Sequence, residues 1–266
     1  MSTLLRQLFL ATVVLVAAVA AWCYPTIYGD TGLIQVPTAD VAEYTHLNFA
    51  IDYTQVNSPN GKYNMYPFRM VYGIGSNSEF YACMSQSTGT QGTKLNVTGG
   101  GAKLAIFNED VENRTPGVAV GIRAFRERDD HTVNVIEGYG VVSKALFSRG
   151  NLTDEGFVVR AHVGASFTSY SGDMKANFGS VFAGLNFRQV NGLGLAVDFI
   201  PAQKKDDVIY RSATVSAVVR YPLSDNFYVE FGSTKPFKAD QNEIYSGVMY
   251  NFGGEAITTK REPVLY

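Results

Sequence analysis

The amino-acid sequence predicts an all-β protein, an antiparallel transmembrane β-barrel of the outer-membrane type with about twelve strands and a short N-terminal segment. Three observations support this prediction. Charged residues make up only 17% of the 266 residues, against about 25% in a typical soluble domain. Apolar and polar residues alternate with period two from Leu47 to Phe252, without a helical period. One apolar run near the N-terminus has the features of an export signal.

Residues 1–21 are expected to be a signal peptide. The run Leu8–Trp22 is almost entirely apolar, and its length of about 15 residues is short of the roughly 20 that a membrane-spanning helix needs. Ala18 and Ala20 form an A-x-A cleavage site. Trp22 before the first cysteine does not fit a lipoprotein signal, so we expect export of an unlipidated mature chain.

Composition limits the partners and the redox chemistry. The formal net charge of −2 gives no basic footprint, so no nucleic-acid partner is expected. Cys23 and Cys83 are the two cysteines, and an exported compartment permits a disulfide between them. Two unpaired thiols are the alternative.

Twelve segments show the alternation, and an even strand number is typical of bacterial outer-membrane barrels. The alternation is clearest in Phe157–Thr168, Phe178–Arg188 and Ser212–Tyr221. The other expected strands are Leu47–Val56, Phe68–Gly75, Ser78–Ser85, Gly99–Phe107, Gly117–Phe125, Val133–Leu146, Gly192–Ile200, Asn226–Thr234 and Ile244–Phe252. The domain organisation is therefore a signal peptide (1–21), an N-terminal segment (22–46), a barrel (47–252) and a C-terminal tail (253–266).

The polar face of these strands indicates a lumen. It carries Gly, Ser, Thr and Asn with single charges, whereas a soluble exterior would carry far more Lys and Glu. A soluble sandwich or barrel poor in charge remains the alternative architecture. The candidate lumen-facing residues are Asp52, Arg69, Arg123, Arg160, His162, Asn186, Arg188, Asp198, Arg220 and Glu230.

The connections favour one orientation. Long polar segments such as Asn57–Pro67 and Gln86–Thr98 alternate with short ones such as Gln189–Gly192. Since outer-membrane barrels have short periplasmic turns and longer external loops, both termini are expected in the periplasm. Aromatic residues near the strand ends, Tyr53 and Phe125 among them, are expected to form interfacial girdles.

The stretch YGDTGLIQVPTA at residues 28–39 resembles the opening of the YjbH-type proteins, an outer-membrane β-barrel family associated with exopolysaccharide production and export. The matching residues are Gly29, Thr31, Gly32, Leu33, Ile34, Pro37, Thr38 and Ala39. The resemblance implies a short, single-barrel version of that family. Gly32 can take a positive φ, because glycine has no side chain. The stretch either folds into the lumen, anchored by Leu33, Ile34 and Val36, or caps the periplasmic end.

No enzyme chemistry is expected, and neither a cofactor nor a metal site. His162 and Ser166 would lie on one strand face about 13 Å apart, too far for a hydrogen bond, and with Asp198 they are expected to form a lumenal polar network. His131 lies beside Asp129 and Asp130, without a partner at ligand spacing.

The sequence therefore predicts a bacterial outer-membrane barrel whose polar lumen takes part in exopolysaccharide secretion or in organising the outer envelope. The expected partners are outer-membrane lipid, the barrel-assembly machinery, and polysaccharide or export components. A structural or adhesive barrel acting through its external loops is one alternative. An outer-membrane lipid or ester hydrolase is the other.

Overall fold

The computed structural model describes residues 24–58, 61–89, 96–110, 114–128, 132–149, 156–189, 192–205, 208–236 and 242–253. The expected signal peptide, Cys23 and the tail beyond Gly253 lie outside these residues, as does the segment that contains His131. Within the described ranges, no helix is long and apolar enough to span a membrane.

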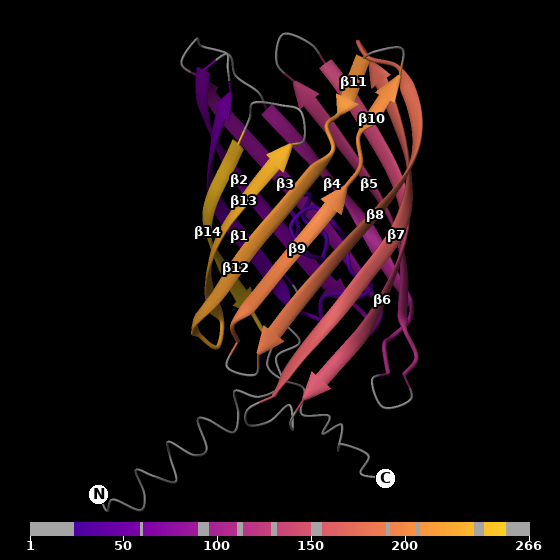
Figure 1. Ribbon diagram of the computed structural model, residues 1–266, viewed down its shortest axis with the longest axis vertical. Coiled ribbons are helices and arrows are strands. Elements are labelled where there is room, and N and C mark those ends of the chain that lie inside the picture. Colours follow the sequence, from indigo (N-terminus) through magenta and orange to yellow (C-terminus); the bar gives the residue numbers. More distant parts are fainter. Residues whose placement is uncertain are drawn as a thin grey trace, which may run out of the picture.

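Twelve strands close into one antiparallel barrel, which confirms the predicted fold class (Figure 1). Consecutive barrel strands pair with each other, and β14 pairs back onto β1. A small hairpin, β10 (Gln203–Lys205) and β11 (Val208–Arg211), is inserted between β9 and β12 at the end opposite the termini. The barrel strands are β1 (Leu47–Ser58), β2 (Gly61–Ile74), β3 (Ser78–Gly89), β4 (Asn96–Phe107), β5 (Gly117–Arg128), β6 (Thr132–Arg149), β7 (Phe157–Gly172), β8 (Ala176–Gln189), β9 (Gly194–Ile200), β12 (Thr214–Ser224), β13 (Phe227–Pro236) and β14 (Asn242–Phe252).

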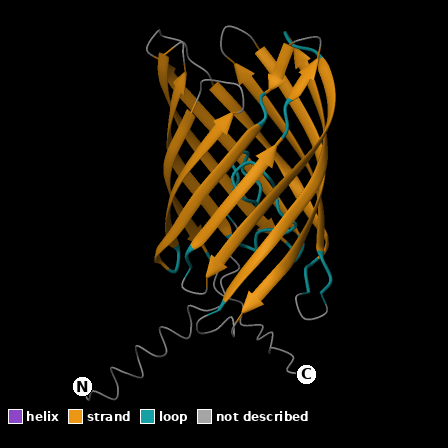
Figure 2. Ribbon diagram, viewed as in Figure 1, coloured by secondary structure: helices purple, strands orange, loops and turns teal. Residues whose placement is uncertain are grey.

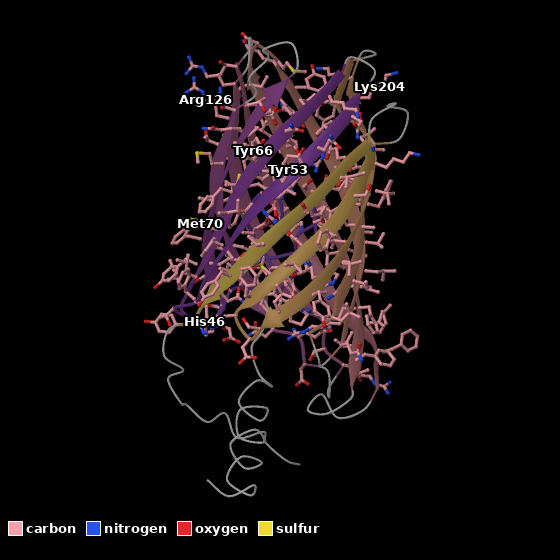
Figure 3. All side chains as sticks on the ribbon, turned by 90° about the vertical axis from the view of Figure 1, so that its left-hand side faces the viewer. His46, Tyr53, Tyr66, Met70, Arg126 and Lys204 are labelled. Carbon is pink, nitrogen blue, oxygen red and sulfur yellow. The ribbon has the colours of Figure 1, made fainter. Side chains whose placement is uncertain are left out.

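The outer face of the barrel is apolar. Val163, Phe167 and Val181 are 58%, 59% and 64% exposed, whereas a soluble protein would cover such side chains. Figure 3 shows Tyr53, Tyr66 and Met70 on this outer face. On β6 the outward positions from Ile136 to Phe147 are apolar or glycine except for Lys144, and they cover about 28 Å along the barrel axis for a rise of about 3.3 Å per residue and a tilt of about 40°. This height matches a membrane-spanning apolar band of about 25 Å.

Inside the wall, large aromatic side chains lie over glycines of neighbouring strands. A Cβ atom added at these glycines would collide with the facing ring, so only glycine leaves room for it. The pairs are Tyr81 over Gly101, Tyr139 over Gly121, Phe182 over Gly164, Tyr245 over Gly232 and Phe125 over Gly99. The expectation that Phe125 belongs to an outer girdle is therefore wrong, because its ring is buried inside the barrel.

Several expected external loops are largely strand. β1 continues to Ser58 and β2 begins at Gly61, so most of the segment 57–67 is paired. Similarly, β3 continues to Gly89 and β4 begins at Asn96. Both faces of a strand meet water beyond the lipid, so the alternation fades there while the backbone pairing continues. The barrel wall begins at Leu47 and ends at Phe252, which pair with each other, so both termini of the wall lie at the same end of the barrel (Figure 1).

Candidate functional site

Residues 24–46 are here called the plug segment; most of it lies inside the barrel (Figure 2), while Tyr44, 56% exposed, lies at the barrel rim next to Gly73. Leu33, Ile34 and Val36 are 2%, 2% and 0% exposed, and they pack in one cluster with lumen-facing side chains such as Tyr139 and Phe182. Of the two sequence-based alternatives, the structure therefore shows the one in which this segment enters the lumen.

The plug segment has a compact local fold of its own. Gly29 has a φ of +99° and lies against the backbone of Ala82, so a side chain there would be strained and would clash. The backbone N–H of Ile27 donates to the carbonyl oxygen of Ile34 at 2.8 Å. Of the two glycines in this stretch, Gly29 and not Gly32 takes the left-handed conformation.

Gly32 is required for another reason, which is close approach of the backbone. Gly32 forms an isolated antiparallel β-bridge with Pro37. A Cβ atom at Gly32 would collide with the carbonyl oxygen of Val36 and lie 2.8 Å from the Cα of Pro37. Both neighbours are backbone atoms, which cannot rotate away.

We expect Gly32→Ala to loosen the plug segment while the barrel stays folded, at a cost of about 1–3 kcal/mol. Limited proteolysis of the folded barrel should cleave the variant in the plug segment sooner than the unaltered protein. Gly138→Ala is the matched control, since a Cβ at Gly138 meets nothing within 4 Å. Equal cleavage rates for the two variants would contradict the close-approach argument.

Asp198 on β9 anchors the tip of the plug segment. Its Oδ2 atom accepts hydrogen bonds from the backbone N–H groups of Ile34, Gln35 and Val36, at 3.0, 2.7 and 3.1 Å. Asp198 is only 1% exposed, so these charge-assisted bonds form away from water and are strong.

Glu79 on β3 is a second carboxylate anchor. It accepts hydrogen bonds from the backbone N–H and the hydroxyl of Thr31, at 2.8 and 2.5 Å, and from the N–H of Ala42 at 2.7 Å. The Nζ atom of Lys103 lies 3.0 Å from Glu79 and donates to the carbonyl oxygen of Thr31 at 2.7 Å. The buried lysine therefore balances the charge of Glu79 and holds the plug segment as well.

Four candidate residues form a buried chain of alternating charge. Arg69 donates to Asp52 at 2.7 Å and to Glu230, and Arg220 donates to Glu230 at 3.1 Å. All four side chains are at most 4% exposed. Each arginine also donates to a carbonyl oxygen of the plug segment, so the chain is both neutral and bonded to the plug. The two acceptors are Pro25, at 2.6 Å from Arg69, and Leu33, bonded to Arg220.

Arg123 on β5 connects the wall formed by β5 and β6 to the plug segment. Its guanidinium bonds Glu137 at 3.1 and 3.2 Å and lies 3.7 Å from Asp30, which also accepts a 2.7 Å bond from the hydroxyl of Tyr139. The same guanidinium lies over the ring of Tyr28, 4.3 Å from its centroid. Burial raises the pKa of the Tyr28 phenol, so this ring stays neutral.

Arg160 holds the end of the plug segment. It forms a two-bond pair with Asp40, at 2.6 and 2.9 Å, and lies 2.7 Å from Glu109. Burial alone would raise the pKa of the Asp40 carboxyl, but the Arg160 guanidinium holds this pKa well below its usual range. Because the pKa is lowered, the Asp40 contribution to docking is present at neutral pH and is lost only in strong acid.

His162 belongs to a relay that also ends on the plug segment. The Nδ1 atom of His162 lies 2.7 Å from the hydroxyl of Ser143, and its Nε2 atom lies 2.8 Å from Asn186. The Ser143 hydroxyl accepts the backbone N–H of Ala39 at 2.8 Å. Ser143 and His162 are both 0% exposed, so the relay is a further buried anchor of the plug segment.

The constellation of His162, Ser166 and Asp198 does not assemble as one unit, since Asp198 is bonded to the plug backbone and His162 to Ser143 and Asn186. In the described part of the chain, no three His, Cys, Asp or Glu side chains form a metal-binding group. Cys83 is a free thiol buried in the barrel beside Phe125. A disulfide with Cys23 stays a prediction, because Cys23 lies outside the described residues.

Arg188 lines a cavity of 240 Å³ below the plug segment, together with Arg160, Asn186 and Arg220. The cavity lies near the end of the barrel that carries the termini, since Ser76 between β2 and β3 is also in its lining. Ligand pockets usually measure about 300–1,000 Å³. The main feature of the lumen is therefore the plug segment and its anchors.

Sequence reasoning missed Glu79, Ser143, Glu137 and Tyr139 as lumen residues. The alternation contained the necessary signal for Glu79, which shares its strand face with Tyr81 and Cys83 and opposes the outward Phe80. No local pattern indicated that Ser143 would meet residue 39, which is 104 positions away in the chain.

No family model matches the chain, and no curated protein matches it either. Solved structures to which it is similar include the KdgM porin, at 14% identity over 77% of this chain and 99% of that one, with a TM-score of 0.49. The COG4313 outer membrane channel from Pseudomonas putida F1 is 10% identical over 82% and 100% of the two chains, with a TM-score of 0.47. The outer membrane protein Omp33 from Acinetobacter baumannii is 8% identical over 79% and 100%, with a TM-score of 0.40.

Proposed function

We propose that this chain is an outer-membrane channel involved in exopolysaccharide export, and that the plug segment closes its lumen in the state described here. The observation that carries the proposal is the set of buried anchors between the barrel wall and residues 24–46, above all the carboxylate of Asp198. A lumen filled only by wall side chains would need no such polar contacts. A separate segment held by hydrogen bonds and ion pairs is one that displacement can release.

The exterior and the resemblance support the placement and the substrate class. The apolar band fits a lipid bilayer, and a closed barrel leaves no unpaired strand edge in it. Every matching residue of the YjbH-like stretch lies in the plug segment, and Thr31, Leu33 and Ala39 contact the wall. A wall rich in hydroxyl, amide and guanidinium groups would offer hydrogen bonds to sugar hydroxyls once the plug has moved.

Membrane fractionation and a polymer assay test this proposal in cells. The protein should fractionate with the outer membrane and show heat-modifiable gel mobility. Cells without it should release less exopolysaccharide, and the intact gene should restore the release. A product in the soluble periplasmic fraction, or unchanged polymer in the deletion strain, would refute the placement or the export role respectively.

The filled lumen also favours a second candidate, a structural or adhesive barrel that works through the end opposite the termini. In that case removal of residues 90–95 between β3 and β4 should abolish partner binding and leave polymer release unaltered. Plug variants would then have no effect on either readout. If the chain is an export channel, plug variants should instead change polymer release.

A further inference from the structure

The outer face of β4, β5 and β6 changes from small or apolar residues to polar and cationic ones toward one end of the barrel. Strand pairing sets Ala124 on β5 beside Gly100 and Ile136, which are small or apolar. Two residues further along β5, away from the termini, the outward residue is Arg126, whose strand neighbours are Thr98 and Asn134. Two further on it is Arg128, beside Asn96 and Thr132. The lipid-facing band therefore ends in two adjoining rows of hydrogen-bonding side chains, each with an arginine.

Both arginines are exposed on the outside of the wall. Their side chains share the face of Ile122, which is 55% exposed, while Arg123 and Phe125, at the alternate positions between Ile122 and Arg126, point into the lumen. Figure 3 shows Arg126 extending away from the barrel at the end opposite the termini. Successive outward residues on a strand are about 6–7 Å apart, so the two guanidinium groups can reach one multiply charged group.

Among the described residues, the outward-facing charges of this patch are positive; Asp129 and Asp130, next in the sequence, lie outside the described residues. Among the described residues, neither Arg126 nor Arg128 lies within 4.0 Å of a carboxylate oxygen, and the carboxylate of Asp173 nearby accepts the Thr132 N–H at 2.7 Å. Glu127 lies between the two arginines in sequence but faces the opposite side of the strand. Other exposed cations at this end of the barrel are Lys62, Lys175, Lys204, Lys205 and Lys235.

We propose that Arg126 and Arg128, with the neighbouring Thr98 and Asn134, bind the phosphate groups of an anionic lipid in the outer leaflet. Guanidinium groups match phosphate in geometry and charge, and hydroxyl and amide side chains supply further donors. The level also fits, because the patch begins where the apolar band stops and the headgroups begin. The proposal rests on the proposed outer-membrane placement, in which this end faces outward and meets phosphorylated glycolipid.

Binding of a phosphorylated glycolipid to the purified mature chain in detergent tests the proposal. The double variant Arg126→Gln/Arg128→Gln should bind phosphorylated lipid A roughly 10- to 30-fold more weakly than the unaltered protein. Arg126→Lys/Arg128→Lys, which keeps the charge, should retain most of the affinity. Heat-modifiable mobility confirms that each variant is folded.

The matched control is Arg114→Gln/Lys144→Gln, which removes the same charge from exposed positions near the other end of the barrel. It should bind like the unaltered protein. The dephosphorylated lipid should bind weakly to all variants, and inorganic phosphate at equal concentration should not displace the lipid. Equal affinity of the double variant and the unaltered protein, or full displacement by inorganic phosphate, would overturn the proposal. This binding assay does not depend on polymer export, so its failure would be separate from failure of the export role.

Discussion

Asp198→Ala barrels in planar lipid bilayers are expected to open far more often than unaltered barrels. The substitution leaves the N–H groups of Ile34, Gln35 and Val36 without the acceptor that all three share. Losing three charge-assisted hydrogen bonds at a buried site costs on the order of 3–6 kcal/mol of docking free energy. The ratio of displaced to docked plug should therefore rise about 100-fold or more.

Single-channel recording measures this ratio directly. Glu243→Ala is the matched control, because Glu243 is a half-buried carboxylate on the lumen face of β14 that makes no described contact with the plug segment. Deletion of residues 26–38 should give the open state permanently. If both the deletion and Asp198→Ala stay silent, the plug segment is not the barrier to conduction, and the structural or adhesive barrel becomes the better interpretation.

The barrel wall could be predicted from the sequence because its rule is local. One residue in two faces lipid, so each strand shows its two faces without knowledge of its neighbours. This rule predicts Asp52, Arg69 and Arg220 in the lumen, and each is buried there. The same rule, applied consistently, would have placed Phe125 inside as well, since it lies two residues after Arg123. The girdle prediction for Phe125 relies on its aromatic side chain and ignores the alternation of inward and outward positions.

The docking of the plug segment could not be predicted, because its contacts join distant parts of the chain. Asp198 meets residue 34 across 164 positions, and Leu33 fills the space that a side chain at Gly184 would need. An aspartate or a glycine on a polar strand face looks the same in the sequence whether it meets water or a folded segment. The motif indicated a special backbone, and the structure shows which glycine supplies the positive φ.

Arg69→Met is expected to be the most destabilising single change in the wall. Arg69 lies between Asp52 and Glu230 and also donates to the carbonyl oxygen of Pro25. Without it, two buried carboxylates face each other with only one cation, Arg220, beside them. Removal of one partner from a buried ion pair usually costs about 3–5 kcal/mol, because the remaining charge stays desolvated and unpaired.

The temperature at which the folded gel band converts to the unfolded band measures this loss, and it should fall markedly in Arg69→Met. The double variant Asp52→Asn/Arg69→Met should recover much of it, because it removes one charge of each sign and leaves the pair of Arg220 and Glu230 neutral. Arg126→Met, at an exposed position on the outer face, should leave the temperature unchanged in detergent. A double variant no more stable than Arg69→Met would mean that the bond to Pro25, and with it the docked plug, stabilises the barrel more than the charge balance does.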